Sequence, residues 1–276
     1  MSLLLHISDT HFGTEKPEVV KALLELASAQ QPDVVVLSGD ITQRATRAQF
    51  AAAARFVAQL APAPVIAIPG NHDIPLFNLA ARLFNPYGHH RRAFGPALEP
   101  VFESDHWLVL AVNTTRPWRH ADGEVSADQV DRVAQRLVRA RPGQLRVVVT
   151  HQPVAVTLPQ DDTNLLHGRA HAVQRWAEAG ADLVLGGHIH LPFVQPLRSH
   201  FAALPRDVWA AQAGTAVSAR TRPEAGNSVN LIRHLGTNAQ LNREAVVERW
   251  DHNSATSRFE PVSNTPLTTA PLHDAV

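Results

Sequence analysis

Short apolar runs recur along the first two-thirds of the chain and alternate with longer stretches in which apolar residues follow a helical period. The apolar runs predict β-strands at residues 3–8, 33–38, 64–68, 107–112, 145–149 and 182–186. The helical stretches predict helices at residues 17–30, 46–60, 127–140 and 169–179. Strands that alternate with helices in this way are typical of a layered α/β fold with a mostly parallel or mixed sheet.

The remaining segments depart from this alternation. Residues 74–100 collect prolines and glycines, and we expect them to form a partly helical insertion. Three later segments are strand-like and are expected to form a second sheet, at residues 207–213, 228–235 and 241–250. The sequence therefore predicts one domain over residues 1–252. Residues 253–276, rich in Ser, Thr and Pro, are predicted to be a loose tail or a segment that lies over another surface.

The amino-terminal apolar run is predicted to be a strand because it lacks the basic flank and the small-residue cleavage site of a signal peptide. No stretch approaches the roughly 20 apolar residues that a bilayer-spanning helix needs. We therefore expect a cytoplasmic protein without a membrane span. A homodimer built through the tail is left open by the sequence.

Composition and charge exclude several classes of protein. The 276 residues include 25 basic and 25 acidic side chains, so the formal net charge is zero and no overall field favours a nucleic-acid partner. The chain has 16 histidines and no cysteine. The lack of cysteine excludes disulfides, thiolate zinc sites, iron–sulfur clusters and a cysteine nucleophile. Any metal must be bound by nitrogen and oxygen atoms.

Polar residues typical of metal ligands follow five of the predicted strands at the point where each strand ends. Parallel strands bring their carboxyl ends to one edge of a sheet, where ligand crevices form. Glycines beside these residues allow sharp turns and close approach. The seven side chains that we expect to meet there as metal ligands are Asp9, His11, Asp40, Asn71, His151, His188 and His190.

Three oxygen donors and four imidazoles are too many for one tetrahedral ion. Two adjacent ions that share a carboxylate need about this number of ligands once a bridging water is added. Imidazole and carboxylate ligands without sulfur suit Fe, Mn, Zn or Co, and the sequence does not choose among these metals. The sequence thus predicts a centre of two divalent or trivalent ions.

The order of these blocks resembles that of the calcineurin-like metallophosphoesterase superfamily, over about residues 1–195. The resemblance implies two packed mixed β-sheets flanked by helices, an α/β sandwich. It also implies that Asp9, His11 and His190 bind the first ion and that Asp40 bridges. By the same resemblance, the ligands of the second ion are Asn71, His151 and His188.

Within that superfamily the chain looks most like the bacterial class III 3′,5′-cyclic-nucleotide phosphodiesterases. This resemblance rests on the compact chain and on the sequence Gly-Glu-Val-Ser at residues 123–126, ahead of a predicted helix. Phosphatase relatives usually carry Gly-Asp-x-x-Asp-Arg-Gly, whereas Gln43 and Ala45 here replace the second Asp and the last Gly. Cyclic nucleotides such as cyclic AMP are therefore the favoured substrates, and a phosphoprotein phosphatase is disfavoured.

The mechanism implied is attack on phosphorus by a hydroxide that the two ions hold. Two divalent ions, two carboxylates and one hydroxide leave the site with a charge of about +1, which attracts an anionic diester. His72 is next to the predicted ligand Asn71 and is expected to point elsewhere than the metals, so it is the predicted general acid or transition-state hydrogen-bond donor. Asp73 is a weaker candidate for orienting His72.

Three alternatives stay open. The substrate could be another small diester or a nucleotide-sugar pyrophosphate, such as a glycerophosphodiester or a UDP-sugar lipid, with residues 74–100 as a cap. A lipid-linked substrate calls for an exposed apolar lid, and the insertion is only moderately apolar. A scaffold without chemistry would lack a ligand, and none of the seven is missing. A DNA nuclease is disfavoured by the neutral charge.

Overall fold

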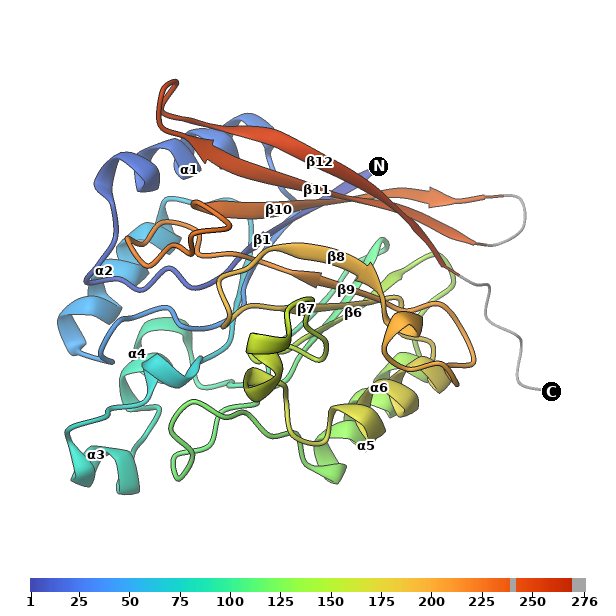
Figure 1. Cartoon of the computed structure of the whole chain (residues 1–276), viewed down its shortest axis with the longest axis horizontal. Helices are drawn as coiled ribbons and strands as arrows, with labels where there is room; N and C mark the ends of the chain where they lie inside the picture. The colour runs from blue at the N-terminus through green and yellow to red at the C-terminus, as the bar shows by residue number, and fades with distance from the viewer. Residues whose placement is uncertain (239–241, 270–276) are drawn as a thin grey trace.

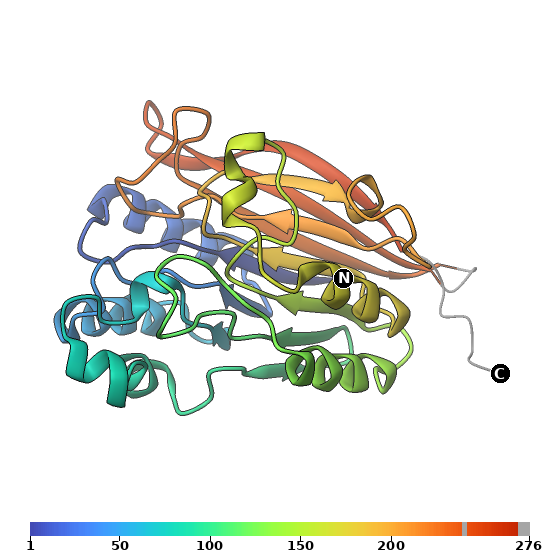
Figure 2. The ribbon, with the colours of Figure 1, turned by 60° about the horizontal axis from the view of Figure 1, so that its bottom comes forward.

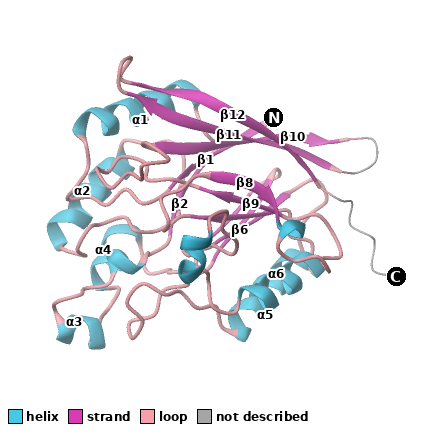
Figure 3. Cartoon of the chain, viewed as in Figure 1, coloured by secondary structure: helices cyan, strands magenta, loops and turns pink. Residues whose placement is uncertain are grey.

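The computed structural model describes residues 1–238 and 242–269. Two six-stranded sheets pack face to face, and helices cover their outer sides (Figure 1). Coloured by secondary structure, the strands cross the upper and central part of the molecule, and the helices lie mainly at the left and below (Figure 3). The sequence prediction of two mixed sheets flanked by helices is confirmed.

The first sheet has the order β12-β11-β10-β1-β2-β3. Its three amino-terminal strands are parallel to one another, and β10 joins them by pairing antiparallel with β1. The members of this sheet are β1 (Ser2–Ile7), β2 (Val34–Leu37), β3 (Val65–Ala67), β10 (Ser228–Thr237), β11 (Arg243–Asn253) and β12 (Arg258–Thr268).

The second sheet has the order β4-β5-β6-β7-β9-β8. Its four central strands are parallel, and both edge strands run antiparallel to their neighbours. The members of this sheet are β4 (Val101–Glu103), β5 (Trp107–Ala111), β6 (Leu145–Val149), β7 (Leu183–Gly186), β8 (Phe193–Pro196) and β9 (Trp209–Gln212).

Alternation along the strands divides the core into three layers. In β1, Leu4 faces the second sheet in the central layer, whereas Leu3 and Leu5 face the helices on the outside. Two helices cover the first sheet, α1 (Pro17–Gln30) and α2 (Arg47–Ala58), and two cover the second, α5 (Ala127–Val138) and α6 (Arg169–Glu178). All four helices occupy segments predicted to be helical. The prediction succeeds because the apolar residues that define the helical period are the ones that packing on the sheets buries.

The carboxyl-terminal third differs from the prediction of a separate second sheet. Strand β9 pairs with β7 and β8, while β10 and β11 extend the first sheet. Strand β12 pairs with β11 over residues that composition predicted to be a loose tail or a covering segment. Apolar alternation identifies a strand but not its partner, because the partner depends on which sheet edge is free in space.

The insertion at residues 74–100 contains two short helices, α3 (Leu79–Phe84) and α4 (Gly88–Phe94). Helix α4 packs on α2, where His90 contacts the rings of Phe50 and Phe94. Helix α3 has no buried residue. Figure 2 shows these teal helices at the periphery, on the side opposite the red carboxyl-terminal strands. Within residues 1–238 and 242–269, no helix has the length and apolar character that crossing a membrane requires.

Candidate metal centre

Five loops, each following the carboxyl end of a parallel strand, meet where the two sheets adjoin. The loops after β1 and β2 supply Asp9, His11 and Asp40, and the loop after β3 supplies Asn71. The loops after β6 and β7 supply the other three predicted ligands. A Cβ atom at Gly70 would collide with the backbone of Asp40, so this glycine is what allows the loops after β2 and β3 to touch.

The backbone is strained where the predicted ligands lie. Eight non-glycine residues of the described chain have positive φ, a conformation that costs about 1 kcal/mol or more per residue. Five of these eight are predicted ligands: Asp9 (φ 52°), His11 (φ 40°), Asp40 (φ 48°), His188 (φ 73°) and His190 (φ 57°). Such clustered strain persists only where the surroundings enforce it, and it is typical of functional sites.

One group of donor atoms gathers around Asp9. Its Oδ1 atom lies 3.2 Å from His190 Nε2 and 3.8 Å from His11 Nε2. The two imidazole Nε2 atoms are 3.0 Å apart. All three side chains are buried, and their donor atoms lie within 4.8 Å of one another. This is the set that the sequence predicted for the first ion.

A second group lies beside the first, and its Asp40 carboxylate also lies close to the first group. Asp40 Oδ1 lies 3.3 Å from His151 Nε2, and Asp40 Oδ2 lies 3.7 Å from His11 Nε2 in the first group. His188 offers a donor atom within 4.8 Å of those of Asp40 and His151. Asn71 Oδ1 lies 3.2 Å from His151 Nε2. The structure therefore brings all seven predicted ligands together, with Asp40 between the two groups.

The donor set fits bound cations on three observations. Asp9 Oδ1 and His188 Nδ1 are buried atoms without a hydrogen-bond partner in the described chain, and orphaned buried polar atoms are rare. His151 Nδ1 donates to the Ser38 carbonyl (2.9 Å) and His190 Nδ1 donates to the Arg220 carbonyl (2.6 Å). These bonds leave the Nε2 lone pairs of both rings directed at the centre, as outer contacts of metal-binding histidines do.

Electrostatics around the two carboxylates point the same way. Burial by itself would raise the pKa of Asp9, but the combined attraction of His190 and His151 outweighs burial and lowers this pKa to about 2. Burial likewise opposes the charged form of His151, yet the neighbouring Asp40 carboxylate raises the pKa of His151 to about 9. Burial lowers the pKa of His11 to about 3. The site thus holds two buried carboxylates that favour positive charge between them.

Asp73 does not contact His72, so the suggestion that it orients this ring is wrong. Its carboxylate accepts hydrogen bonds from the backbone N–H groups of Gly70 (2.9 Å), Ile41 (3.0 Å) and Thr42 (2.8 Å). A carboxylate at this position therefore ties together the loops after β2 and β3. Burial, together with the nearby Asp40 carboxylate, raises the pKa of Asp73 to about 6.

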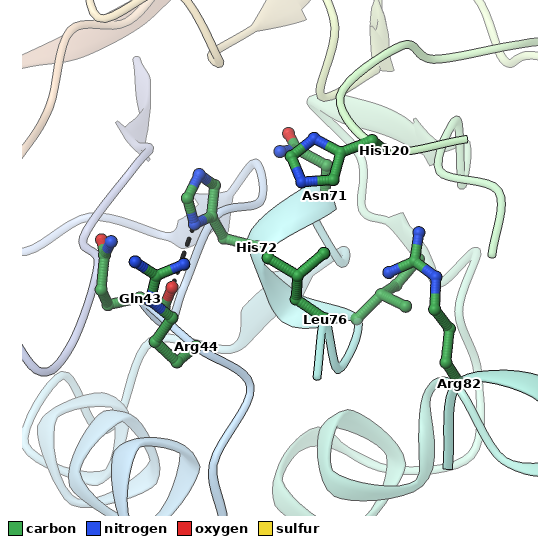
Figure 4. A pocket seen from close by; sticks show the side chains of 8 residues that line it. Gln43, Arg44, Asn71, His72, Leu76, Arg82 and His120 are labelled. Atoms are coloured by element: carbon green, nitrogen blue, oxygen red, sulfur yellow. Dashed lines mark hydrogen bonds between the residues drawn. The ribbon is translucent and has the colours of Figure 1, made fainter. Parts of the chain in front are cut away.

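His72 lies beside the two groups, but the expectation that it points elsewhere than the metals is wrong. Its ring offers a donor atom within 4.8 Å of those of His11 and Asp40, which makes a third set of side chains that could hold an ion. Its backbone N–H donates to Asp40 Oδ1 (2.8 Å), and its ring Nδ1 donates to the Gln43 carbonyl (3.0 Å). Figure 4 shows this ring bond at the wall of a pocket. His72 Nε2 faces a guanidinium nitrogen of Arg220 at 3.0 Å. Since a guanidinium only donates, the ring nitrogen accepts this hydrogen bond.

Arg220 is the site residue that sequence reasoning missed. It lies in the loop between β9 and β10, and its guanidinium also faces Gln43 Oε1 (3.2 Å) and His11 Nδ1 (3.4 Å). No strand ends beside it and no ligand-like spacing surrounds it, so the sequence carries no local signal for it.

A pocket opens from the centre on the side of Asn71 and His72 (Figure 4). Its walls contain cationic and apolar side chains and no carboxylate, which favours an anionic ligand. The guanidinium of Arg82 on this wall is held by the carbonyls of Pro75 and Arg119. The lining residues are Gln43, Arg44, Asn71, His72, Ile74, Leu76, Arg82 and His120.

The sequence profile of the calcineurin-like phosphoesterase family matches residues 3–192. The chain belongs to this family. The matched range contains all seven predicted ligands and His72 and ends before β8. Family membership confirms the superfamily prediction.

Two curated bacterial relatives of this family member are named as phosphodiesterases. A probable cyclic nucleotide phosphodiesterase of Synechococcus sp. is 32% identical over 173 residues, which cover 60% of this chain and 61% of the relative. A cAMP/cGMP dual specificity phosphodiesterase of Mycobacterium tuberculosis is 26% identical over 203 residues, covering 68% and 61%. The match thus spans about three-fifths of the length of these relatives.

Solved structures share the fold of this phosphoesterase at low sequence identity. A purple acid phosphatase from yellow lupin superposes with a TM-score of 0.67 at 12% identity, covering 97% of this chain and 53% of the lupin chain. A dimetal phosphatase from Danio rerio gives a TM-score of 0.63 at 12% identity, covering 98% and 99%. These likenesses confirm the sandwich architecture.

Proposed function

We propose that the protein hydrolyses phosphodiesters with two metal ions held by the seven side chains at the strand ends. One observation carries the proposal: buried and half-buried His and Asp donors lie in adjoining sets, and the Asp40 carboxylate lies between them, 3.7 Å from His11 and 3.3 Å from His151. A carboxylate between two cation positions is what a two-ion hydrolytic site needs. Ions bound there would supply positive charge for phosphoryl oxygens and lower the pKa of a water molecule.

Each side chain has a proposed task. Asp9, His11 and His190 would hold the first ion, and Asp40 would contact both ions. The second ion would be held by Asn71, His151 and His188. The amide of Asn71 adds no charge, so the second position keeps more of its positive charge than a carboxylate ligand would leave it.

Cyclic nucleotides such as cyclic AMP are the proposed substrates within this class. The names of the Synechococcus and Mycobacterium relatives support this choice, although they belong to proteins only 26–32% identical. The arginine side chains in the wall of the pocket beside Asn71 and His72 favour an anionic ligand. Gln43 stands where phosphatase relatives have an aspartate, which supports a diester over a phosphoprotein.

His72 is proposed to contact the reacting phosphoryl group. Its backbone bond to Asp40 and its ring bond to the Gln43 carbonyl fix the ring beside both donor groups. Donation from Nε2 requires a second ring proton and release of the Arg220 contact. A His72→Gln variant that binds both metals and keeps the wild-type kcat would remove His72 from this role.

The function is tested on the full chain after metal removal. Activity on bis(4-nitrophenyl) phosphate should disappear on chelation and return with Mn²⁺ or Fe²⁺, and cyclic AMP should be turned over under the same conditions. Glycerophosphocholine and a nucleotide-sugar pyrophosphate are the comparison substrates. Full activity of the metal-free protein would overturn the proposal, and preference for either comparison substrate would replace cyclic nucleotides.

A lipid-linked phosphodiester is the second candidate, favoured by the exposed apolar surface of the insertion. Phe77, Leu79, Leu83 and Phe84 are 81%, 67%, 75% and 87% exposed. These side chains adjoin Leu76 of the pocket wall along the chain. Such exposure is more lid-like than the sequence alone indicated, because residues of this kind are usually buried in a soluble domain.

The two candidates separate in one comparison. A Leu83→Ser/Phe84→Ser double variant should lose most activity on a phosphodiester lipid in mixed micelles and keep its activity on bis(4-nitrophenyl) phosphate. Equal activity of variant and wild type on the micellar substrate would rule out the lipid candidate.

The cytoplasmic location and the homodimer stay predictions. Sedimentation analysis at several protein concentrations tests the homodimer.

A further inference from the structure

The loop between β9 and β10 belongs to the centre although it lies outside residues 3–192, the range that the family profile matches. Thr215 Oγ1 donates to the Asp9 carbonyl (2.6 Å), which ties the loop to the first predicted ligand. Arg222 pairs with the Asp161 carboxylate (2.8 Å), and Asn227 Nδ2 donates to the Ser218 carbonyl (2.8 Å). The loop is therefore built into the site and fixed at several points.

Arg220 projects from this fixed loop toward the donor groups. Its guanidinium faces three neutral partners, His72 Nε2 (3.0 Å), Gln43 Oε1 (3.2 Å) and His11 Nδ1 (3.4 Å). No carboxylate of the described chain lies within ion-pair distance of it. A half-buried guanidinium without a counter-charge leaves its positive charge available to an anion.

The backbone of the same residue contacts the metal centre. The Arg220 carbonyl accepts the hydrogen bond of His190 Nδ1 (2.6 Å), so it orients a predicted ligand of the first ion. One residue thus fixes a ligand ring with its carbonyl while its side chain reaches the space beside His11 and His72. A side-chain substitution leaves the carbonyl in place and separates these two tasks.

We propose that Arg220 binds a non-bridging oxygen of the substrate phosphoryl group, an inference that rests on the proposed phosphodiesterase function. A guanidinium matches phosphoryl oxygens in geometry as well as charge. In this inference Arg220 takes the place of His72 as the side-chain donor, and His72 and Gln43 are positioning residues, because both accept hydrogen bonds from the guanidinium and aim it. Arg220 is the donor to the phosphoryl oxygen, and the His72 ring holds it there.

The other arginines near the pocket are less suited to this task. Both terminal nitrogens of Arg82 donate to backbone carbonyls, so its guanidinium is already engaged. The guanidinium of Arg44 lies over the Phe77 ring, 5.7 Å from its centroid, and the residue is exposed. Of the three, only Arg220 contacts a predicted metal ligand and the predicted catalytic histidine together.

The test compares Arg220→Gln and Arg220→Lys with the wild-type full chain, all loaded with Mn²⁺. We expect Arg220→Gln to lower kcat/KM on bis(4-nitrophenyl) phosphate about 100-fold, the size of effect seen when one donor to a reacting oxyanion is removed. Inhibition by inorganic phosphate should weaken about tenfold, and Arg220→Lys should lie between the two. Metal content and Tm should stay at wild-type values.

Chemical rescue distinguishes a phosphoryl contact of Arg220 from a purely structural role, because added guanidinium ion would not restore activity lost through a structural change. Millimolar guanidinium ion should restore part of the activity of Arg220→Ala and leave the wild type unchanged. Arg222→Gln is the matched control, because it removes the nearby anchor to Asp161 and should lower Tm without responding to guanidinium. A lower Tm of Arg220→Gln together with the same inhibition by inorganic phosphate as in the wild type would overturn the proposal.

Failure of the proposed function can be distinguished from failure of this inference. If the wild type hydrolyses no diester, titration calorimetry of inorganic phosphate into the Mn²⁺-loaded protein still compares wild type with Arg220→Gln. Weaker phosphate binding by the variant would support a phosphoryl contact at Arg220. Equal binding by the two proteins would reject it.

Discussion

Asp9 and His188 are 179 residues apart in the chain, yet the Asp9 Oδ2 atom accepts a hydrogen bond from the His188 backbone N–H at 2.9 Å. Ser8 Oγ donates to the same oxygen at 2.6 Å. The other carboxylate oxygen, Oδ1, has no hydrogen-bond partner in the described chain and faces the imidazoles of the first donor group. One oxygen of Asp9 thus joins two loops, and the other is left for a cation.

Asp9→Asn should separate these two tasks. The side-chain oxygen of Asn can still accept the His188 N–H, so the two loops stay joined, and Tm of the metal-free protein should fall only by the lost attraction to His190. The loss of negative charge should weaken binding of the first ion by more than about tenfold, since even outer contacts of metal ligands are worth that much. Metal analysis after dialysis against dilute Mn²⁺ measures the effect. Asp105→Asn, at an 87% exposed side chain, is the control and should keep its metal.

Substitution of one histidine in either donor group should remove one ion and leave the other bound. His190→Asn removes a member of the first group and His151→Asn a member of the second, while Asp40 remains in both variants. Each variant should therefore bind about one ion where the wild type binds about two. Elemental analysis gives the count. Loss of both ions in either single variant would contradict the assignment of separate positions.

Asp73→Ala should destabilise the protein without removing a predicted ligand. The substitution leaves the buried N–H groups of Gly70, Ile41 and Thr42 without their acceptor. Loss of these charge-assisted hydrogen bonds should lower the free energy of unfolding by about 3 kcal/mol. Urea unfolding of the metal-free protein measures it. Asp122→Ala, at a half-exposed side chain, is the control and should change stability by less than about 0.5 kcal/mol.

His90 should make the protein sensitive to acid. Burial lowers the pKa of His90 from 6.5 to about 4, and both of its ring nitrogens lack a hydrogen-bond partner in the described chain. Between pH 6.5 and pH 4 the unfolded chain binds the proton and the folded chain does not. Stability therefore falls as the pH falls through this window, and the contribution of His90 to that loss is about 3 kcal/mol by pH 4.

His90→Leu should remove this part of the acid sensitivity. The variant should be as stable as the wild type or more stable at pH 7.5, because an unpaired polar ring is replaced by an apolar side chain. Its advantage should grow as the pH falls from 6.5 to 4. Urea unfolding at a series of pH values follows the change. A matched variant, His171→Leu at an exposed position on α6, should show the pH profile of the wild type.

The candidate ligands could be predicted because their signal is local. A strand such as β6 is recognised from its own apolar run, and a histidine such as His151 follows just after its end in the sequence. Parallel strands then bring such ends together by the geometry of the sheet. The prediction for Asp73 failed because two partners of its carboxylate, Thr42 and Ile41, lie in another loop, 31 and 32 residues away.

The sequence by itself determined six strands and four helices of the first two-thirds of the chain, the family, and which seven side chains are candidate ligands, since periodicity and residue type act over short stretches. It did not predict the short edge strand β4. Only the tertiary structure decided that β10 pairs with β1 and that Arg220 meets His72 across 148 residues. Such pairs depend on which backbone edges and loop surfaces are free when the sheets pack. No local pattern of apolar and polar residues encodes that arrangement.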